Sequence, residues 1–426
     1  MSTESHSIPD KLSDLTTSGL FPLLSPGEQD FLAHLATTYP LSYQEFRTLI
    51  QHSRDLTMWQ EPPLAVLWEG VASAVAPHLP PLQKKKEIFK GVQKKMKDYV
   101  ESPKSYPESG LSKPKRNSLS FVSGGSNTSL IGDCPVASEK TVCCNLKTID
   151  AVENCAFGCS YCTIQTFYQD KVVVNDHILE ALQNTELDPE RFYHIGTGQS
   201  SDSLVWGNKE GILEKILAFA QKHPNILLEL KTKSANVSYL IQHDRPKNVV
   251  CSWSLNTETI IQNEEHFTSP LEQRLEAARK AADAGIAVAF HFHPIVHYDK
   301  WEQDYGALAE RVLHEFSPEE VLFLSFGSVT FIKPVLKQIR ERGEPSKILQ
   351  MEMTPDPHGK LTYSKERKVE MFRFMHNAFR PWHNKVFMYL CMERAEIWHE
   401  VFGWHYETNE IFEEEFRKLK NSLSNQ

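Results

Sequence analysis

The sequence feature that most restricts the fold is a regular alternation of short β-rich runs and amphipathic helical stretches after residue 140. The β-rich runs are TVCCNLKTIDAV, RFYHIGTG, NILLELKTK, NVVCSWSLN, AVAFHFHPI and EVLFLSFGSV. Helical patterns such as KEGILEKILAFAQKH, SPLEQRLEAARKAADAG and WEQDYGALAERVLHEF separate them. Six such β-then-α units predict an α/β fold, with a parallel sheet covered by helices. Ligands then collect at the loops that follow the carboxyl ends of the strands.

The regions on either side of this core have different patterns. The N-terminal stretch predicts helices, because Ser25 to Glu28 fits a capping box and LAVLWEGVASAVA is an apolar helical segment. The next stretch is rich in Ser, Pro and Gly and predicts a linker. We therefore expect a helical N-terminal region at 1–100, a basic linker at 101–130, the α/β barrel at 131–345 and a C-terminal extension at 346–426.

The eight cysteines indicate metal or redox chemistry rather than a disulfide framework. The N-terminus has no basic segment followed by an apolar run, and no window approaches the roughly 18 apolar residues of a membrane span. We expect a cytoplasmic protein with no membrane partner, in which cysteines remain thiols. A hydrophobic content of 40% over 426 residues is enough for an ordinary buried core.

Positive charge is concentrated in one part of an acidic chain. The formal net charge is −9, yet residues 84–116 hold eleven basic and four acidic residues, a local balance of +7. Such a stripe could neutralise nucleic-acid phosphates while the rest of the chain stays acidic. A solvated helix followed by a linker explains the same charge run.

The stretch CAFGCSYC places Cys155, Cys159 and Cys162 in one short loop just after the first β-rich run. A structural zinc site normally takes four ligands, which Cys143 and Cys144 could complete. A 4Fe-4S cluster held by only three thiolates leaves one iron open to a small molecule. The three-cysteine spacing therefore favours a cluster with an open iron.

This CxxxCxxC spacing, with an aromatic residue before the last cysteine, resembles the radical S-adenosylmethionine (radical SAM) superfamily. The resemblance implies that the open iron binds the amino and carboxylate groups of S-adenosylmethionine (SAM). An electron, supplied by a donor such as flavodoxin or ferredoxin, then splits SAM into methionine and a 5'-deoxyadenosyl radical. The family fold, a partial (β/α)6 barrel with the cluster after the first strand, agrees with the alternation described above.

Further sequence runs narrow the resemblance from the superfamily to one family within it. CSYCTIQTFY, LELKTKSANVSYL, WSLNTETIIQNEEHFTSPLEQRLEAARKAADAG and the segment around Trp301 are similar to the spore photoproduct lyase family. The similarity covers roughly residues 140–340. Members of that family repair a thymine dimer in DNA by abstracting a hydrogen atom, letting the crosslink fragment and returning a hydrogen atom.

The resemblance implies a set of cofactor-binding residues beside the cluster ligands. Backbone near the SAM amino group would come from Gly196, Thr197 and Gly198, where glycine permits close approach. Polar groups at strand ends would be Ser201, Lys233 and Ser254, with Lys233 as a point charge for the SAM carboxylate, and more weakly Asn256 and His293. Tyr161 would pack on SAM or carry a hydrogen relay; a core tyrosine fits the position equally well.

Two positions depart from the family pattern. The cysteine that returns the hydrogen atom in characterised lyases lies three residues before the aspartate matching Asp202, where this chain has Gln199. The tyrosine that follows the third cluster cysteine is replaced by Thr163. Either another thiol, Cys251 or Cys391, supplies the hydrogen atom, or the reaction differs. Burial as inert side chains is the alternative for both cysteines.

Three functions remain open from the sequence. The first is a photoproduct lyase-like radical SAM enzyme that acts on a damaged or modified nucleic-acid base, which must leave the stack to react. The second keeps the radical chemistry but acts on a small molecule or a peptide, in line with the acidic net charge and Gln199. The third is a non-catalytic zinc or iron-sulfur binding protein.

Overall fold

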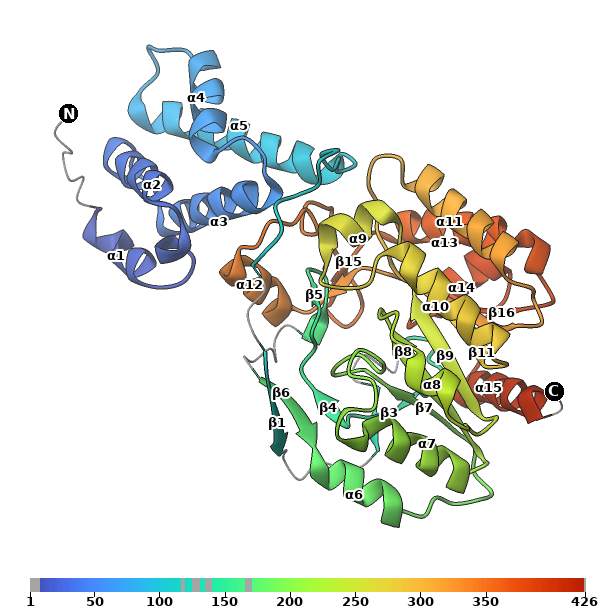
Figure 1. Cartoon of the computed structure of the whole chain (residues 1–426). Coiled ribbons are helices and arrows are strands. Elements are labelled where there is room, and N and C mark those ends of the chain that lie inside the picture. Colours follow the sequence, from blue (N-terminus) through green and yellow to red (C-terminus); the bar gives the residue numbers. More distant parts are fainter. Residues whose placement is uncertain (1–7, 116–118, 125–130, 135–139, 165–170, 425–426) are drawn as a thin grey trace. The chain divides into compact units, whose positions relative to one another are not determined.

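The computed structural model describes residues 8–115, 119–124, 131–134, 140–164 and 171–424. These residues form two compact units (Figure 1). The first unit is Met1–Pro114 with Ile332–Glu352, and the second is Lys115–Phe331 with Met353–Gln426. Parts of the predicted linker and of the run CSYCTIQTFY lie outside the described residues. The predicted boundaries at residues 100, 130 and 345 stay a prediction.

The first unit is helical. The Ser25 side chain accepts from the Glu28 backbone N–H at the start of α2, and the Glu28 carboxylate accepts from the Ser25 backbone N–H, which confirms the predicted capping box. On α5, Ile88, Val92 and Met96 are buried at a four-residue spacing, so the lysines occupy the remaining faces. The helices of this unit are α1 (Asp10–Thr17), α2 (Pro26–Thr38), α3 (Tyr43–Trp59), α4 (Leu64–Ala74), α5 (Pro81–Glu101) and α12 (Lys333–Arg342), with the 3-10 turn η1 (Phe21–Leu23).

The second unit is built on an eight-stranded sheet with the order β16-β12-β11-β9-β8-β7-β3-β2. Every neighbouring pair is parallel except β2 with β3. The six predicted runs form β3, β7, β8, β9, β11 and β12 in chain order, which confirms the predicted barrel. The strands are β2 (Gly132–Asp133), β3 (Lys147–Ile149), β7 (Tyr193–Thr197), β8 (Ile226–Thr232), β9 (Val249–Ser254), β11 (Ala287–Ile295), β12 (Val321–Ser328) and β16 (Phe387–Leu390).

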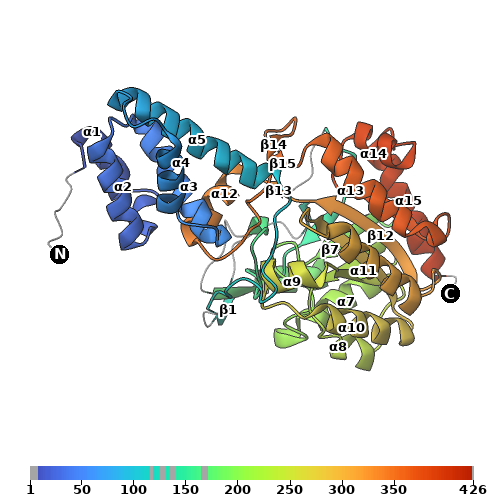
Figure 2. The same ribbon diagram turned by 90° about the horizontal axis from the view of Figure 1, so that it is seen from above.

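Helices cover the outer face of this sheet and one helix packs on its inner side. Figure 2 shows α7, α8, α10 and α11 gathered beside the sheet. From the inner side, Phe416 of α15 stacks on His194 of β7 at 4.3 Å between ring centres. The helices are α6 (Asp176–Asn184), α7 (Ile212–Lys222), α8 (Ser238–Gln242), α9 (Glu258–Glu264), α10 (Leu271–Asp283), α11 (Trp301–Glu315), α13 (Lys365–Ala378), α14 (Ala395–Phe402) and α15 (Asn409–Ser424), with the 3-10 turns η3 (Lys209–Gly211) and η4 (Arg380–Trp382).

Three small sheets complete the unit. One has the order β1-β6-β4, so part of the predicted linker is a strand: β1 pairs in parallel with β6. No helix among the described residues is long and apolar enough to cross a membrane. The short strands are β1 (Ser120–Gly124), β4 (Val152–Glu153), β5 (Gly158–Cys159), β6 (Lys171–Asn175), β10 (Glu265–His266), β13 (Thr330–Phe331), β14 (Thr354–Pro355) and β15 (Leu361–Thr362).

Candidate active site

The three-cysteine loop is held by a short ladder to a distant segment. Within the loop, β5 pairs antiparallel with β10, and Cys159 lies opposite Glu265. The Ser160 backbone N–H donates to the Glu264 carbonyl at 2.9 Å, and the Ser160 hydroxyl donates to the Glu264 carboxylate. At the start of the loop, the Asn154 side chain accepts from the Cys155 N–H at 2.9 Å. The loop backbone is therefore fixed at both ends.

Cys155, Cys159 and Cys162 are not joined in disulfides and belong to, or pack against, a small apolar cluster. Ala156 and Phe157 form its core with Cys159, and Trp206 packs against them. Burial raises the pKa of Cys155 and of Cys159, although the positive charge of Lys233 opposes the shift at Cys159. A bound metal would deprotonate such thiols outright. Three thiols of one short loop therefore fit a cluster with one open iron.

Single-ion zinc binding is not indicated at this loop. Within the part of the chain that the structure describes, no three His, Cys, Asp or Glu side chains stand at the spacing of one metal ion. The ligands of an iron-sulfur cluster bind separate irons, so they can stand farther apart.

Asp202 organises the loop that follows β7. Its carboxylate accepts from the backbone N–H groups of Leu204 (3.0 Å), Val205 (2.9 Å) and Lys233 (2.7 Å), and from the Thr232 hydroxyl (2.8 Å). Burial raises the pKa of Asp202 against these hydrogen bonds. Asp202 therefore joins the carboxyl ends of β7 and β8, a role that the sequence did not reveal.

Ser201 connects that loop to the cysteine loop. The Ser201 hydroxyl donates to the Asn154 carbonyl at 2.8 Å and accepts from the Trp206 ring N–H at 3.2 Å. Its hydroxyl is thus used to position the residue before Cys155.

The glycine segment at the end of β7 needs its last residue to be glycine. Gly198 has φ +85°, and a Cβ there would lie 2.7 Å from the Ser203 hydroxyl and 3.0 Å from the Lys231 carbonyl. The Thr197 and Ser203 hydroxyls are hydrogen-bonded at 2.7 Å. The Ser203 and Lys231 backbones therefore approach this turn so closely that only glycine fits at residue 198. That residues 196–198 meet the SAM amino group stays a prediction.

A charged cluster lies beside the cysteine loop. The Arg274 guanidinium donates to the Glu265 carboxylate at 2.6 Å, and the Tyr161 hydroxyl donates to the other carboxylate oxygen. The Lys233 ammonium lies 5.8 Å from the centre of the Tyr161 ring. Two cations thus face one carboxylate, which leaves positive charge for an anionic ligand group.

The pKa shifts agree with this charge distribution. Burial raises the pKa of Glu265, but Arg274 and Lys233 outweigh it, so the net pKa is lowered and the carboxylate stays ionised. Burial lowers the pKa of Lys233, but Glu265 and the nearby thiols raise it above its usual value. Burial and Glu265 raise the pKa of Tyr161, which remains a phenol.

The remaining predicted residues, Ser254 and the weaker predictions Asn256 and His293, differ in their surroundings. The Ser254 carbonyl accepts from Arg274 at 2.8 Å. Asn256 is buried and its amide donates to the Pro294 carbonyl at 3.0 Å, while its oxygen accepts from Tyr305 at 2.6 Å. His293 borders two cavities, and burial lowers its pKa, so the ring is neutral.

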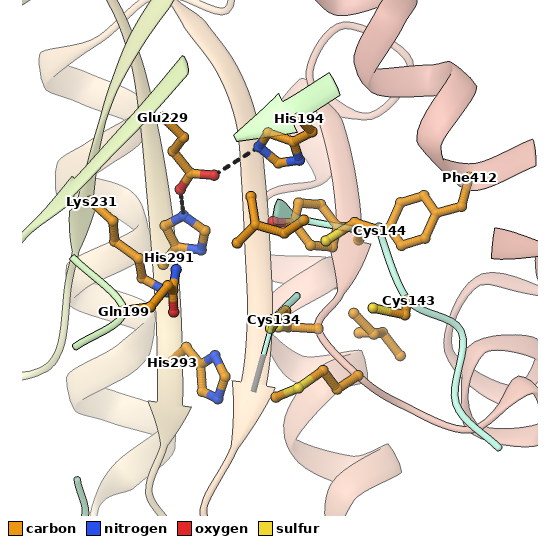
Figure 3. Close-up of a pocket in the computed structure, with 15 residues that line it drawn as sticks. Cys134, Cys143, Cys144, His194, Gln199, Glu229, Lys231, His291, His293 and Phe412 are labelled. Atoms are coloured by element: carbon orange, nitrogen blue, oxygen red, sulfur yellow. Dashed lines mark hydrogen bonds and ion pairs between the residues drawn. The ribbon is translucent and has the colours of Figure 1, made fainter. Parts of the chain in front are cut away.

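A cavity occupies the inner side of the sheet (Figure 3). Gln199, Lys231 and His293 lie on one side of it, and cysteines lie on the other. Cys391 is one of these cysteines, whereas Cys251 is 0% exposed and does not line the cavity. Of the two thiols predicted as hydrogen donors, only Cys391 thus shares a cavity with Gln199.

A buried carboxylate organises the floor of this cavity. Glu229 accepts from His194 Nε2 at 3.0 Å, from His291 Nε2 at 2.6 Å and from the Ser252 hydroxyl at 2.6 Å. The sequence analysis missed this group. The available signal was the period-two placement of polar residues in LLELKT and AVAFHFHPI.

A second, polar cavity adjoins the first and shares His293 and Cys391 with it. Lys360, Lys368 and Arg394 contribute positive charge to its wall. The Lys368 ammonium is paired with the Glu393 carboxylate at 2.7 Å.

Comparison with known proteins identifies one family. The family model described as spore photoproduct lyase matches residues 145–383, more than half of the chain. The spore photoproduct lyase of Clostridium acetobutylicum is 24% identical over 245 residues, which cover 55% of this chain and 73% of that protein. The lyase of Bacillus subtilis is 27% identical over 208 residues, which cover 46% of this chain and 60% of that protein.

Solved structures show the same fold. A spore photoproduct lyase mutant with bound S-adenosylmethionine and dinucleoside spore photoproduct matches with a TM-score of 0.53 and 21% identity. A spore photoproduct lyase complexed with dinucleoside spore photoproduct matches with a TM-score of 0.54 and 22% identity. Each match covers 63% of this chain and 82% of the other.

Proposed function

Because this chain belongs to the spore photoproduct lyase family of radical SAM enzymes, we propose that it repairs a thymine-dimer lesion in DNA. The observation that carries the proposal is the loop of Cys155, Cys159 and Cys162 at the carboxyl end of the barrel, inside the span that matches the family. The enzyme uses a 4Fe-4S cluster and SAM, and the cluster supplies the electron that splits SAM.

The residues around the loop have defined roles in this proposal. The thiolates of Cys155, Cys159 and Cys162 hold the cluster. Lys233 binds the SAM carboxylate, and the turn at Gly198 admits the SAM amino group to the backbone. Asp202 fixes both elements through its four hydrogen bonds. Tyr161, held by Glu265, packs against the bound cofactor.

The DNA substrate rests on two observations. The structures that share this fold include lyases with dinucleoside spore photoproduct. The cavity that holds Lys360, Lys368 and Arg394 against Asp356 and Glu393 keeps one excess positive charge, which suits a phosphate-containing substrate. We also propose a cytoplasmic enzyme, reduced by a flavodoxin or ferredoxin.

The experiment is an anaerobic assay of the reconstituted, reduced protein. SAM is added alone, with UV-irradiated DNA and with undamaged DNA, and both 5'-deoxyadenosine and thymine dimers are measured. We expect dimer loss only with irradiated DNA. A Cys159→Ala protein is the control and should form no deoxyadenosine. Deoxyadenosine formation without dimer loss would contradict the DNA substrate and direct the search to small molecules or peptides.

A further inference from the structure

Four of the five cysteines outside the three-cysteine loop line a single cavity. They are Cys134, Cys143, Cys144 and Cys391, and none of them is in a disulfide. Figure 3 shows the three labelled cysteines facing Glu229, Lys231 and the histidines across this cavity. The fifth, Cys251, lies elsewhere in the buried core. The proposed function uses none of the first three thiols.

The fold brings these thiols together from opposite edges of the sheet. Cys134 follows β2, and its N–H donates to the Leu146 carbonyl at 3.2 Å. Cys391 follows β16, at the other edge. An antiparallel bridge of Val142 with Glu393 connects the segment of Cys143 and Cys144 to that of Cys391, with the Val142 N–H donating at 2.9 Å to the Glu393 carbonyl. The cluster of thiols is thus a product of tertiary structure and not of a local loop.

Two histidines that line the same cavity each have one ring nitrogen without a hydrogen-bond partner among the described residues. His194 is 0% and His291 is 4% exposed, and both line the cavity. Their Nε2 atoms are bound to Glu229, while both Nδ1 atoms are buried without a hydrogen-bond partner among the described residues. A buried polar atom without a partner is costly. A carboxylate that orients a histidine from behind is also the usual arrangement behind a metal ligand.

We propose that this cavity is a second metal centre, an iron-sulfur cluster held by the thiolates of Cys134, Cys143, Cys144 and Cys391. Four cysteine thiolates are the standard ligand set of such a cluster. Lys231 on the cavity wall offsets part of the negative charge that thiolate ligands bring. Its proposed ligands are different residues from those of the cluster in the proposed function, so the inference does not depend on that cluster.

The occupant is inorganic because the cavity is small. It encloses about 70 Å³, against the roughly 300–1,000 Å³ of pockets that bind drug-sized organic molecules. Four thiols and two imidazole nitrogens are also more donors than the four that a single zinc ion takes. Within the described residues no three donors stand at single-ion spacing, which is equally true of the thiols at 155–162. A cluster with several metal atoms fits both sets.

One consequence concerns the returned hydrogen atom. As a cluster ligand Cys391 is a thiolate and has no S–H hydrogen to give. Of the two thiols predicted as hydrogen donors, Cys391 is then excluded.

The test is the iron and acid-labile sulfide content of the full chain after anaerobic reconstitution. The protein with Cys155→Ala, Cys159→Ala and Cys162→Ala lacks the family's cluster site. We expect it to retain about four irons and four sulfides per chain if the second centre is a 4Fe-4S cluster, or about two of each for 2Fe-2S. An electron paramagnetic resonance signal should appear after reduction. A folded triple variant with no iron and sulfide, or with zinc alone, would overturn the proposal.

Further variants locate the centre. Adding Cys144→Ser and Cys391→Ser to the triple variant should remove the remaining iron, whereas adding Cys251→Ser should not. Circular dichroism checks that each protein is folded. If the cavity variants unfold, the triple variant alone still decides the question. Wild-type protein that holds both clusters but forms no deoxyadenosine would refute the proposed function and leave this inference intact.

Discussion

At the scale of single residues, the candidate site depends on one closely packed glycine and one buried carboxylate. Gly198 permits a turn that other residues would strain, and Asp202 collects four donors at one carboxylate. The sequence located the three-cysteine loop, because the spacing of cysteines within a loop is a local property. It could not show that Asp202 holds the ends of two strands together, because those partners are distant in the chain.

Replacing Gly198 should disturb both stability and cofactor binding. Gly198→Ala meets strain at φ +85° and a clash with the Ser203 hydroxyl and the Lys231 carbonyl. We expect a loss of about 1–3 kcal/mol in the free energy of unfolding, measured by denaturant titration, and weaker SAM binding. The control is Gly70→Ala in α4, where a Cβ meets no atom within 4 Å. Equal stability of both variants would contradict the account.

Lys233 should control SAM affinity through its charge. Lys233→Gln removes one of the two cations that face Glu265, so the SAM carboxylate loses its partner. We expect the dissociation constant for SAM, measured by calorimetry on the reconstituted protein, to rise by about tenfold or more. Lys222→Gln on α7 is the control and should leave the dissociation constant for SAM unchanged. An unaltered dissociation constant in Lys233→Gln would remove Lys233 from the site.

At the scale of elements, one buried ion pair ties α10 to the neighbouring strands. Arg274 is 0% exposed and bonds the Ser254 carbonyl of β9, the Ser269 carbonyl and the Glu265 carboxylate of β10. The sequence predicted α10 from its periodicity, because that pattern is local. It missed β16, which has only four residues and lies outside the β-α repeat.

Breaking this pair should be far costlier than breaking a surface pair. Arg274→Ala removes the cation that is hydrogen-bonded to the buried Glu265 carboxylate, and we expect a loss of about 3–5 kcal/mol in the free energy of unfolding. Arg311→Ala breaks the more exposed pairs with Glu272 and Glu315, and should cost less than about 1 kcal/mol. Denaturant titration compares the two. Similar losses in the two variants would contradict the expectation that breaking the buried pair costs more than breaking the exposed pairs.

The contact of α10 with the start of β12 should depend on pH. Hydrogen bonding to Arg279 lowers the pKa of Glu320 from 4.5 to about 2. Because the pKa of Glu320 is lower in the folded protein than in the unfolded chain, its ionised carboxylate stabilises the folded protein at pH values above the unfolded pKa. This stabilisation is lost as the pH falls from about 4.5 to 2. Because the pair is partly exposed, the contribution is below about 1 kcal/mol. The stability difference between wild type and Glu320→Gln should therefore vanish over that range; a constant difference would contradict this.

At the scale of the whole molecule, the sequence predicted the barrel but not its interior. The β-α repeat determines strand order, whereas the cavity needs residues from 134 to 412 to meet. Cys134, Cys144 and Cys391 line the same cavity although they are far apart in the chain, and composition and periodicity do not predict such tertiary proximity. Likewise, β1 pairs with β6 about fifty residues away, so its strand was hidden in a Ser-, Pro- and Gly-rich stretch.

The basic stretch should act as a phosphate-binding surface if DNA is the substrate. Lys86, Lys90 and Lys94 are exposed on α5. Reversing all three to Glu should weaken binding of irradiated DNA at least tenfold at low salt and reduce the slope of log K against log salt by about three. Fluorescence anisotropy measures both. Lys280→Glu, Lys337→Glu and Lys418→Glu together make the same charge change elsewhere and should have less effect; equal effects would contradict a specific surface.

The most direct test of the central claim is the formation of 5'-deoxyadenosine from SAM by the anaerobically reduced protein. The account predicts deoxyadenosine from wild type and from Cys251→Ala, and none from Cys159→Ala, because Cys159 is one of the three ligands of the cluster that splits SAM and Cys251 is not. Absence of deoxyadenosine from wild-type protein with a complete iron and sulfide content, or its formation by Cys159→Ala, would contradict the account.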